Sequence, residues 1–190
     1  INSASTGNFL VPTLIPQVSA RPWGGAFTTG LTTYAWTTQA SGGYLYASGR
    51  GNFGQLGNGS TADTSAMTAV TKASDSSQLV GVVKCIGSEE ANGYATTAYA
   101  LNALGELYSW GHAGNGALGN GATSPHQVRA VLIATGVLDF SVVGGGDKAV
   151  FILKTNGDLV SFGANTEGCL GLGDLVDRSV PTAVRTNGTS

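Results

Sequence analysis

One 17-residue pattern occurs three times in this sequence, and this internal repeat constrains the fold more than any other feature. The copies begin at Gly43, Gly105 and Gly157 and align without gaps. A fixed repeat indicates small structural units that stack on one another, because a unit of this size cannot bury its own apolar faces. We therefore take residues 43–59, 105–121 and 157–173 as the kernels of three successive repeats.

The second part of each kernel combines glycines at fixed places with a leucine that recurs in register. Glycine adopts positive φ without the penalty that a Cβ brings, so this pattern predicts a tight crossing of the chain. The leucine predicts an apolar plug that holds the crossing to the core. A flexible glycine-rich linker, the alternative, would not repeat a leucine in register. The candidate structural residues are Gly49, Gly54, Leu56, Gly57, Gly59, Gly111, Gly116, Leu118, Gly119, Gly121, Gly163, Gly168, Leu170, Gly171 and Gly173.

Short apolar and β-branched runs flank each kernel. In the third repeat, residues 149–153 and 158–162 surround Asn156-Gly157, and Asn-Gly between two such runs is a strong hairpin signal. No stretch shows sustained helical periodicity. The corresponding runs of the other repeats are 79–86, 96–101 and 106–110, and 31–38 and 44–48. The sequence predicts an all-β fold with about four strands in each repeat, as in the blades of a β-propeller.

The kernels resemble those of a known family. Residues 49–59, GRGNFGQLGNG, with GYLYAS before them and a Thr/Ser loop after them, are similar to the regulator of chromosome condensation repeat. The copies WGHAGNGALGNG and FGANTEGCLGLG are similar to it as well. The resemblance covers residues 27–185 and implies a β-propeller, although Thr97 and Ala149 stand where the family often places a histidine.

Three repeats are too few for a complete ring, because propellers of this family usually have about seven blades. We expect a partial propeller that further repeats of a longer polypeptide, or other subunits, complete. Residues 27–190 are expected to hold the three repeats. Residues 1–26 contain the apolar run FLVPTLIPQV and are expected to form an N-terminal arm or a closing strand.

Composition and charge exclude several classes of partner. Charged residues make up 11% of the chain, against about 25% in ordinary globular proteins, and the net charge is −2. Without clustered Lys and Arg the chain lacks the footprint of a nucleic-acid-binding protein. No apolar run approaches the roughly 18 residues of a membrane helix, so we expect no membrane insertion. Cys85 and Cys169 match no metal or redox spacing; we expect both to be small buried residues, with a disulfide as the alternative.

The sequence contains no recognisable catalytic set, and we expect no catalytic residue, cofactor or metal site. His112 and His126 have no acidic or cysteine neighbour at ligand spacing, which favours surface or kernel histidines. Asp174 and Asp177 lie together after the third kernel. A solvated turn beside Arg178 is the favoured interpretation of this pair, and a cation site or acid/base pair is the alternative.

Most aromatic residues alternate along expected strands, which predicts packing between blades. Two that fall at expected loop tips, Phe53 and Tyr94, are candidate contact residues for a glycan or a partner protein. We therefore predict a non-catalytic binding or structural module. The composition is similar to that of phage tail and fibre proteins, so the expected setting is a virion or extracellular assembly. Expected partners are other protein subunits, from the same chain or from virion proteins, and surface glycans.

The family resemblance implies two alternative functions. One is a guanine-nucleotide exchange factor for a small GTPase, and the other is an inhibitor or scaffold propeller that caps an enzyme. The basic tail expected of the first alternative is missing from this sequence. Nothing in the sequence separates the second alternative from a binding module.

Overall fold

In the computed structural model, residues 22–29, 31–38, 43–89, 96–123, 126–143 and 149–184 are described. Within these ranges the chain forms β-strands and one short 3-10 helix, η1 (Gly114–Gly116). The strands are β1 (Trp23–Thr29), β2 (Thr32–Thr37), β3 (Leu45–Gly49), β4 (Thr64–Ala69), β5 (Val82–Glu89), β6 (Thr96–Asn102), β7 (Leu107–Gly111), β8 (Gln127–Ala134), β9 (Val137–Val142), β10 (Ala149–Lys154), β11 (Leu159–Gly163) and β12 (Arg178–Ala183).

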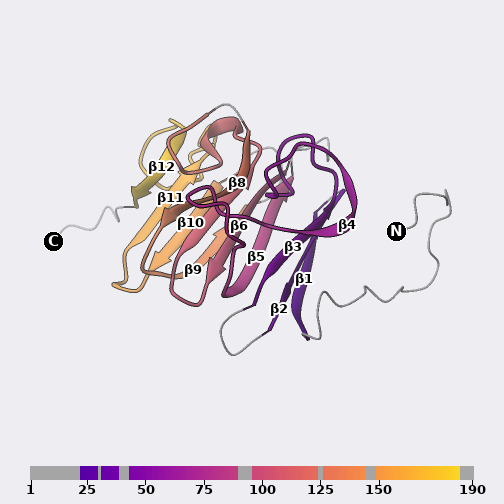
Figure 1. The fold of residues 1–190 in the computed structure, drawn as a ribbon. Coiled ribbons are helices and arrows are strands. Elements are labelled where there is room, and N and C mark those ends of the chain that lie inside the picture. Colours follow the sequence, from indigo (N-terminus) through magenta and orange to yellow (C-terminus); the bar gives the residue numbers. More distant parts are fainter. Residues whose placement is uncertain are drawn as a thin grey trace, which may run out of the picture.

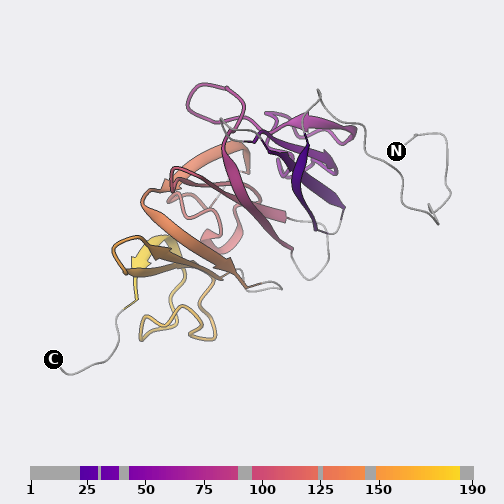
Figure 2. The same ribbon diagram turned by 90° about the horizontal axis from the view of Figure 1, so that it is seen from below.

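The strands form three four-stranded antiparallel sheets, in the orders β1-β2-β3-β4, β5-β6-β7-β8 and β9-β10-β11-β12. Strands that follow one another in the chain are neighbours in the sheet. The sheets stand side by side in chain order, and a view from below shows them fanning apart (Figures 1 and 2). The first strands of successive sheets contact each other, β1 with β5 and β5 with β9. These sheets are propeller blades, called blades 1, 2 and 3 below, and the predicted all-β fold is confirmed.

The second and third strands of every blade pair in the same register over five residues. In each blade the glycine that ends the third strand lies opposite a residue near the start of the second. The pairs are Gly49 with Thr32, Gly111 with Thr97, and Gly163 with Ala149. The three blades can therefore be compared position by position.

The apolar core lies between the blades. One cluster joins blades 1 and 2, with Tyr34 and Leu45 on one side and Trp110 on the other. A second cluster joins blade 2, through Tyr99, to blade 3, through Phe162. This arrangement is expected of stacked repeats, in which each unit buries its faces against its neighbours.

A charged contact also joins blades 2 and 3. The Lys84 ammonium on β5 lies 2.6 Å from the Asp139 carboxylate on β9. It also donates a hydrogen bond of 2.6 Å to the carbonyl oxygen of Phe140 and lies 4.9 Å from the centre of the Phe140 ring. Because both charged side chains are partly exposed, this pair adds little to the stability that the apolar core provides.

Strand β1 was not predicted from the sequence. It runs across the predicted boundary between the N-terminal arm, residues 1–26, and the first repeat, which was expected to begin at residue 27. Its apolar pattern is interrupted by Gly24 and Gly25, which lie against the Trp36 side chain on β2; a Cβ at either position would collide with a neighbouring side chain. Residues 1–21 lie outside the described residues, so the N-terminal arm or closing strand stays a prediction.

Candidate functional site

Each kernel contains the third strand of its blade, and its glycine-rich second part emerges at the same edge of every blade (Figure 1). This second part begins with a glycine at positive φ, with values of 107° at Gly49, 98° at Gly111 and 107° at Gly163. A Cβ on Gly49 would collide with the carbonyl oxygen of Leu31, and one on Gly111 with that of Thr96. The chain can therefore leave the strand in this direction only at glycine.

The kernel leucines are completely buried: Leu56, Leu118 and Leu170 are each 0% exposed. In blades 2 and 3 a serine from the third strand holds the main chain beside the leucine. Ser109 donates a hydrogen bond of 2.6 Å to the carbonyl oxygen of Leu118, and Ser161 donates one of 2.9 Å to that of Leu170. Strand and kernel are thus tied together at the position where the leucine enters the core.

The kernels also receive the next blade. A Cβ on Gly57 would lie 2.9 Å from the Trp110 ring of blade 2, and one on Gly119 would lie 2.7 Å from the Phe162 ring of blade 3. Trp110 and Phe162 occupy the same place on their third strands. Glycine at this kernel position therefore leaves space for an aromatic ring of the following blade.

A second pair of kernel glycines meets the last strand of the next blade. A Cβ on Gly54 would lie 2.9 Å from the carbonyl oxygen of Gln127, where β8 begins. A Cβ on Gly116 would lie 2.6 Å from the carbonyl oxygen of Arg178, where β12 begins. Sequence reasoning assigned these glycines to the turn and missed their role in blade packing.

Buried hydrogen bonds fix the same junctions. The carbonyl oxygen of Gln55, in the first kernel, accepts bonds from the Tyr34 hydroxyl at 2.7 Å and from Trp110 Nε1 at 2.8 Å. The carbonyl oxygen of Ala117, the equivalent residue of the second kernel, accepts one from the Tyr99 hydroxyl at 2.5 Å. Burial raises the pKa of both tyrosines well above the ordinary value, so these hydroxyls remain donors at all physiological pH values.

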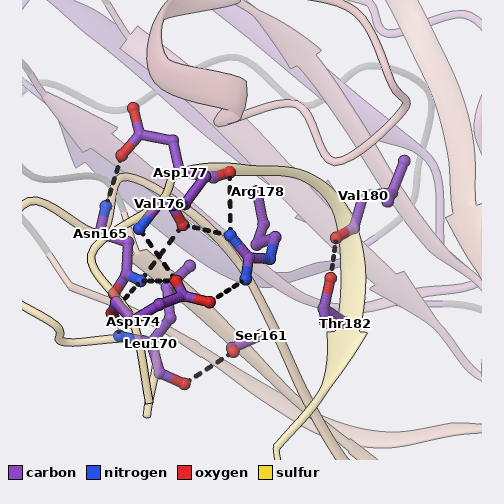
Figure 3. Close-up of polar contacts among 9 residues, drawn as sticks. All are labelled: Ser161, Asn165, Leu170, Asp174, Val176, Asp177, Arg178, Val180 and Thr182. Atoms are coloured by element: carbon purple, nitrogen blue, oxygen red, sulfur yellow. Dashed lines mark hydrogen bonds and ion pairs between the residues drawn. The ribbon is translucent and has the colours of Figure 1, made fainter. Parts of the chain in front are cut away.

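The third kernel is organised by Asn165, which is 0% exposed (Figure 3). Its side-chain amide donates hydrogen bonds to the carbonyl oxygens of Asp174, at 2.9 Å, and Val176, at 3.2 Å. Its side-chain oxygen accepts one from the main-chain N–H of Leu170 at 2.9 Å. Its own main-chain N–H donates to the Asp177 carboxylate at 2.7 Å. Asn165 therefore connects the buried leucine to the loop that follows it.

The carboxylate of Asp174 is engaged on both oxygens. Oδ1 accepts a hydrogen bond from the main-chain N–H of Val176 at 2.9 Å, and Oδ2 lies 2.6 Å from the Arg178 guanidinium (Figure 3). The Val176 N–H and then Arg178 lower the pKa of Asp174 below its usual range. These contacts agree with a turn beside Arg178. Among the residues that the structure describes, no group of three or more His, Cys, Asp or Glu side chains could hold a metal ion.

Phe53 lies against two histidines from blade 2. Its ring centre is 5.4 Å from that of His112 and 4.8 Å from that of His126, both in edge-to-face geometry, and the two imidazoles are 5.1 Å apart. The main-chain N–H of Gly114 donates to His112 Nδ1 at 3.3 Å. The sequence did not predict that the two histidines lie close together. Their contact arises where blade 2 packs against Phe53 of blade 1, and the spacing of residues along the chain carries no information on such packing. Phe53 is half-buried, and its ring already has protein partners.

Comparisons with known proteins identify the repeat. The profile of the Regulator of chromosome condensation (RCC1) repeat matches residues 156–189, which include the third kernel. The chain is 32% identical to the Ultraviolet-B receptor UVR8 of Arabidopsis thaliana over 149 residues, 78% of this chain and 31% of the receptor. It is 34% identical to the human E3 ubiquitin-protein ligase HERC2 over 143 residues, 75% of this chain and 3% of the ligase. The chain belongs to the RCC1 repeat family.

Solved structures of RCC1 proteins share this fold. Yeast RCC1 (Prp20), in its complex with Kap60, matches with a TM-score of 0.59 and 19% identity, over 86% of this chain and 37% of that one. Prp20p from Saccharomyces cerevisiae, whose structure was described with its binding to Gsp1p and histones, matches with a TM-score of 0.54 and 15% identity, over 91% and 52%. Our chain thus spans less than two thirds of each of these relatives.

Two further expectations concern side chains of the RCC1 repeats. Cys85 and Cys169 are free thiols; Cys85 is buried and burial raises its pKa, whereas Cys169 is exposed. The expectation that both are buried is therefore wrong for Cys169. Cys169 occupies the kernel position of Gln55 and Ala117, which are both buried beside a following blade.

Tyr94 lies outside the described residues, so its role in glycan or protein contact stays a prediction.

Finally, the structure bears on the membrane expectation only through its helices. Within the described ranges, no helix is long and apolar enough to cross a membrane.

Proposed function

We propose that this chain is a non-catalytic protein-binding module of the RCC1 repeat type. The observation that carries the proposal is the apolar surface of blade 3. Leu153 and Leu159 on the sheet are 38% and 39% exposed, and Leu175 and Val176 in the loop after the kernel are more than half exposed. Leu153 and Leu159 are cross-strand partners, and adjacent exposed apolar side chains on a folded protein are typical of a site of protein association.

The proposed partners are other protein subunits, and the proposed setting is a virion or extracellular assembly. Support for the setting is compositional: 11% charged residues and a net charge of −2 give a nearly neutral surface rich in small residues. Detection of the chain by mass spectrometry in purified particles, or in the secreted fraction, supports this setting. Its recovery only from the interior of cells contradicts it.

A capture experiment tests the binding function. The immobilised chain is incubated with an extract of its source cells, beside L153E/L159E and the control L104E. Leu104 is 80% exposed at the turn between β6 and β7 of blade 2. We expect one or a few proteins to be retained by the wild type and L104E and lost from L153E/L159E. Retention of no protein, or equal retention by all three, contradicts the proposal.

A nucleotide-release assay separates this function from guanine-nucleotide exchange. Small GTPases loaded with labelled GDP are mixed with the chain, and the rate of release is measured. A binding module leaves the rate unchanged. Accelerated release would replace the proposed function with that of an exchange factor.

A further inference from the structure

Arg129, on β8, differs from the other Lys and Arg side chains of the described ranges, because it has no acceptor there. The structure describes six such side chains, and five of them contact a protein oxygen. These contacts are Arg50 with Asn52, Lys72 with Asp75, Lys84 with Asp139, Lys154 with the Thr135 carbonyl oxygen, and Arg178 with Asp174. No hydrogen bond or ion pair joins the Arg129 side chain to a described residue, and its Nε atom is buried. Because a buried N–H without an acceptor is destabilising, this state indicates a role beyond packing.

The Arg129 guanidinium lies flat on the first kernel. A Cβ on Gly59 would lie 2.5 Å from Nη2, 2.6 Å from Cζ and 3.1 Å from Nε of Arg129. Since the central Cζ is almost as close as Nη2, the guanidinium presents its flat face to Gly59, and its N–H bonds point sideways from this contact. Asn58 pairs with Arg129 in an isolated antiparallel bridge, so the site lies where blade 1 meets blade 2. Glycine at position 59 therefore leaves room for the guanidinium without covering its N–H edges.

Packing at this place does not require an arginine. In each blade one residue of the last strand pairs with the glycine that ends the third strand, and these residues are Thr64, Gln127 and Arg178. Two residues further on, where blade 2 has Arg129, blade 1 has Ala66 and blade 3 has Val180. The Cγ1 atom of Val180 lies 3.7 Å from the place of a Cβ on Gly121, the second-kernel equivalent of Gly59. A small or apolar side chain thus suffices here, and the charge of Arg129 needs a separate reason.

Main-chain N–H groups beside Arg129 are already engaged. Gly59 donates a hydrogen bond of 2.8 Å to the carbonyl oxygen of Val128. Ala130 donates one of 2.8 Å to the carbonyl oxygen of Thr71. Phosphate sites are commonly built from several main-chain N–H groups that point at the anion. With these N–H groups engaged, the guanidinium is the positive group that the site offers, and it balances one negative charge.

We propose that Arg129 binds a carboxylate group. The planar guanidinium can meet the two oxygens of a carboxylate with two parallel N–H bonds, and one carboxylate balances its single charge. The carboxylate belongs to an Asp, a Glu or the C-terminus of a protein partner, or to a free organic acid, and each presents the same two oxygens. This site at the junction of blades 1 and 2 goes beyond the proposed function, whose surface lies on blade 3.

A titration followed by NMR tests the site. Sodium acetate is added to the isotope-labelled full chain, and the main-chain N–H signal of Gly59 and the Nε–H signal of Arg129 are followed. We expect saturable shifts of both signals with a dissociation constant of about 10–100 mM, the range for one charge-assisted pair. Sodium chloride at the same ionic strength, and neutral acetamide, should not produce them. Arg178 already contacts Asp174, so its Nε–H signal is the internal control and should not shift.

Three variants separate the guanidinium from general charge. R129V introduces the side chain that blade 3 carries at this place, and R129K keeps the charge but removes the planar fork. Both should weaken the acetate response of the Gly59 signal at least about tenfold. K154M removes a cation from blade 3 and should respond to acetate as the wild type does. The remaining main-chain signals show whether each variant is folded, and R129K provides the test if R129V is not.

Two short capped peptides, one with a single glutamate and one with glutamine in its place, identify the source of the carboxylate. Tighter binding of the glutamate peptide than of acetate supports a group of a protein partner. Equal binding of the glutamate peptide and acetate supports a free organic acid. Equal binding of the glutamate and glutamine peptides overturns the inference, because the site then does not recognise a carboxylate.

The titrations can also overturn the inference directly. The absence of a saturable shift at Gly59 with acetate would do so, as would an equal response of R129V and the wild type. Tighter binding of inorganic phosphate than of acetate would assign the site to another anion. The outcome is independent of the capture experiment, because L153E/L159E leaves Arg129 intact and should bind acetate as the wild type does.

Discussion

Trp110 of blade 2 donates a hydrogen bond from Nε1 to the carbonyl oxygen of Gln55 in the kernel of blade 1, across 2.8 Å. The same oxygen accepts the hydroxyl of Tyr34, which belongs to blade 1 itself. The ring of Trp110 lies edge-on to Tyr34, with 5.9 Å between ring centres. One main-chain oxygen thus ties together a blade, its kernel and the following blade.

This shared acceptor predicts that Y34F and Y99F differ in cost. In Y34F the Gln55 carbonyl keeps its bond from Trp110, so we expect a loss of about 0.5–1 kcal/mol in the free energy of unfolding. In Y99F the buried Ala117 carbonyl loses the side-chain donor that the structure assigns to it, and we expect about 1–3 kcal/mol. Urea denaturation of both variants measures the difference. Equal losses would show that Trp110 does not support the Gln55 carbonyl in solution.

The kernel leucine predicts a large cavity effect. Leu118 is 0% exposed, and L118A should lower the free energy of unfolding by about 2–5 kcal/mol. L104A, at an exposed turn, is the control and should change it by less than about 0.5 kcal/mol. L118D should leave blade 2 unfolded, because it buries a charge without a partner. A thermal midpoint of L118D equal to that of the wild type contradicts the assignment of Leu118 as the apolar plug.

The repeat architecture predicts a contrast between G171A and G119A. Both glycines have similar positive φ, 69° and 65°, so the backbone cost of alanine, about 1–2 kcal/mol, is shared. Only at Gly119 does the new methyl group meet the Phe162 ring, which adds about 1–3 kcal/mol for overpacking. Chemical denaturation should therefore show a clearly larger loss for G119A. Similar losses would mean that the blade-3 ring does not lie over Gly119.

The contact between Lys84 and Asp139 predicts a small pH dependence. The Lys84 ammonium and then the Phe140 N–H lower the pKa of Asp139, so its stabilising contribution is present above the unfolded-state pKa of about 3.9 and is lost as pH falls. Because Asp139 is largely exposed, the contribution is at most about 1 kcal/mol. The thermal midpoint of D139N should lie slightly below that of the wild type at pH 7 and coincide with it near pH 2. A difference that persists at pH 2, or one unaffected by high salt at pH 7, argues against the pair.

Much of this fold is visible in the sequence because its signals are local. The hairpin at Asn156-Gly157 lies where predicted, and Gly157 has φ of 89°. The strands beside it, expected at 149–153 and 158–162, are found at Ala149–Lys154 and Leu159–Gly163. Each of these features depends on residues close together in the chain.

Features that depend on neighbouring blades could not be read from the sequence. Cys169 is exposed because no blade among the described residues covers it, and no local pattern reports this. The contact of His112 with His126 arises beside Phe53 of another blade. The interruption of the β1 pattern at Gly24 and Gly25 has a cause, Trp36, that lies on the adjacent strand.

The central claim is that one glycine in each of the first two kernels, Gly57 or Gly119, lies under an aromatic ring of the next blade. A double-mutant cycle of Gly119 and Phe162 tests this claim most directly. The free energies of unfolding of the wild type, G119A, F162A and G119A/F162A are measured by chemical denaturation. We predict that G119A costs at least about 1 kcal/mol less when Phe162 is already alanine, because the added methyl group then finds open space. Additive costs, within about 0.5 kcal/mol, would contradict the claim.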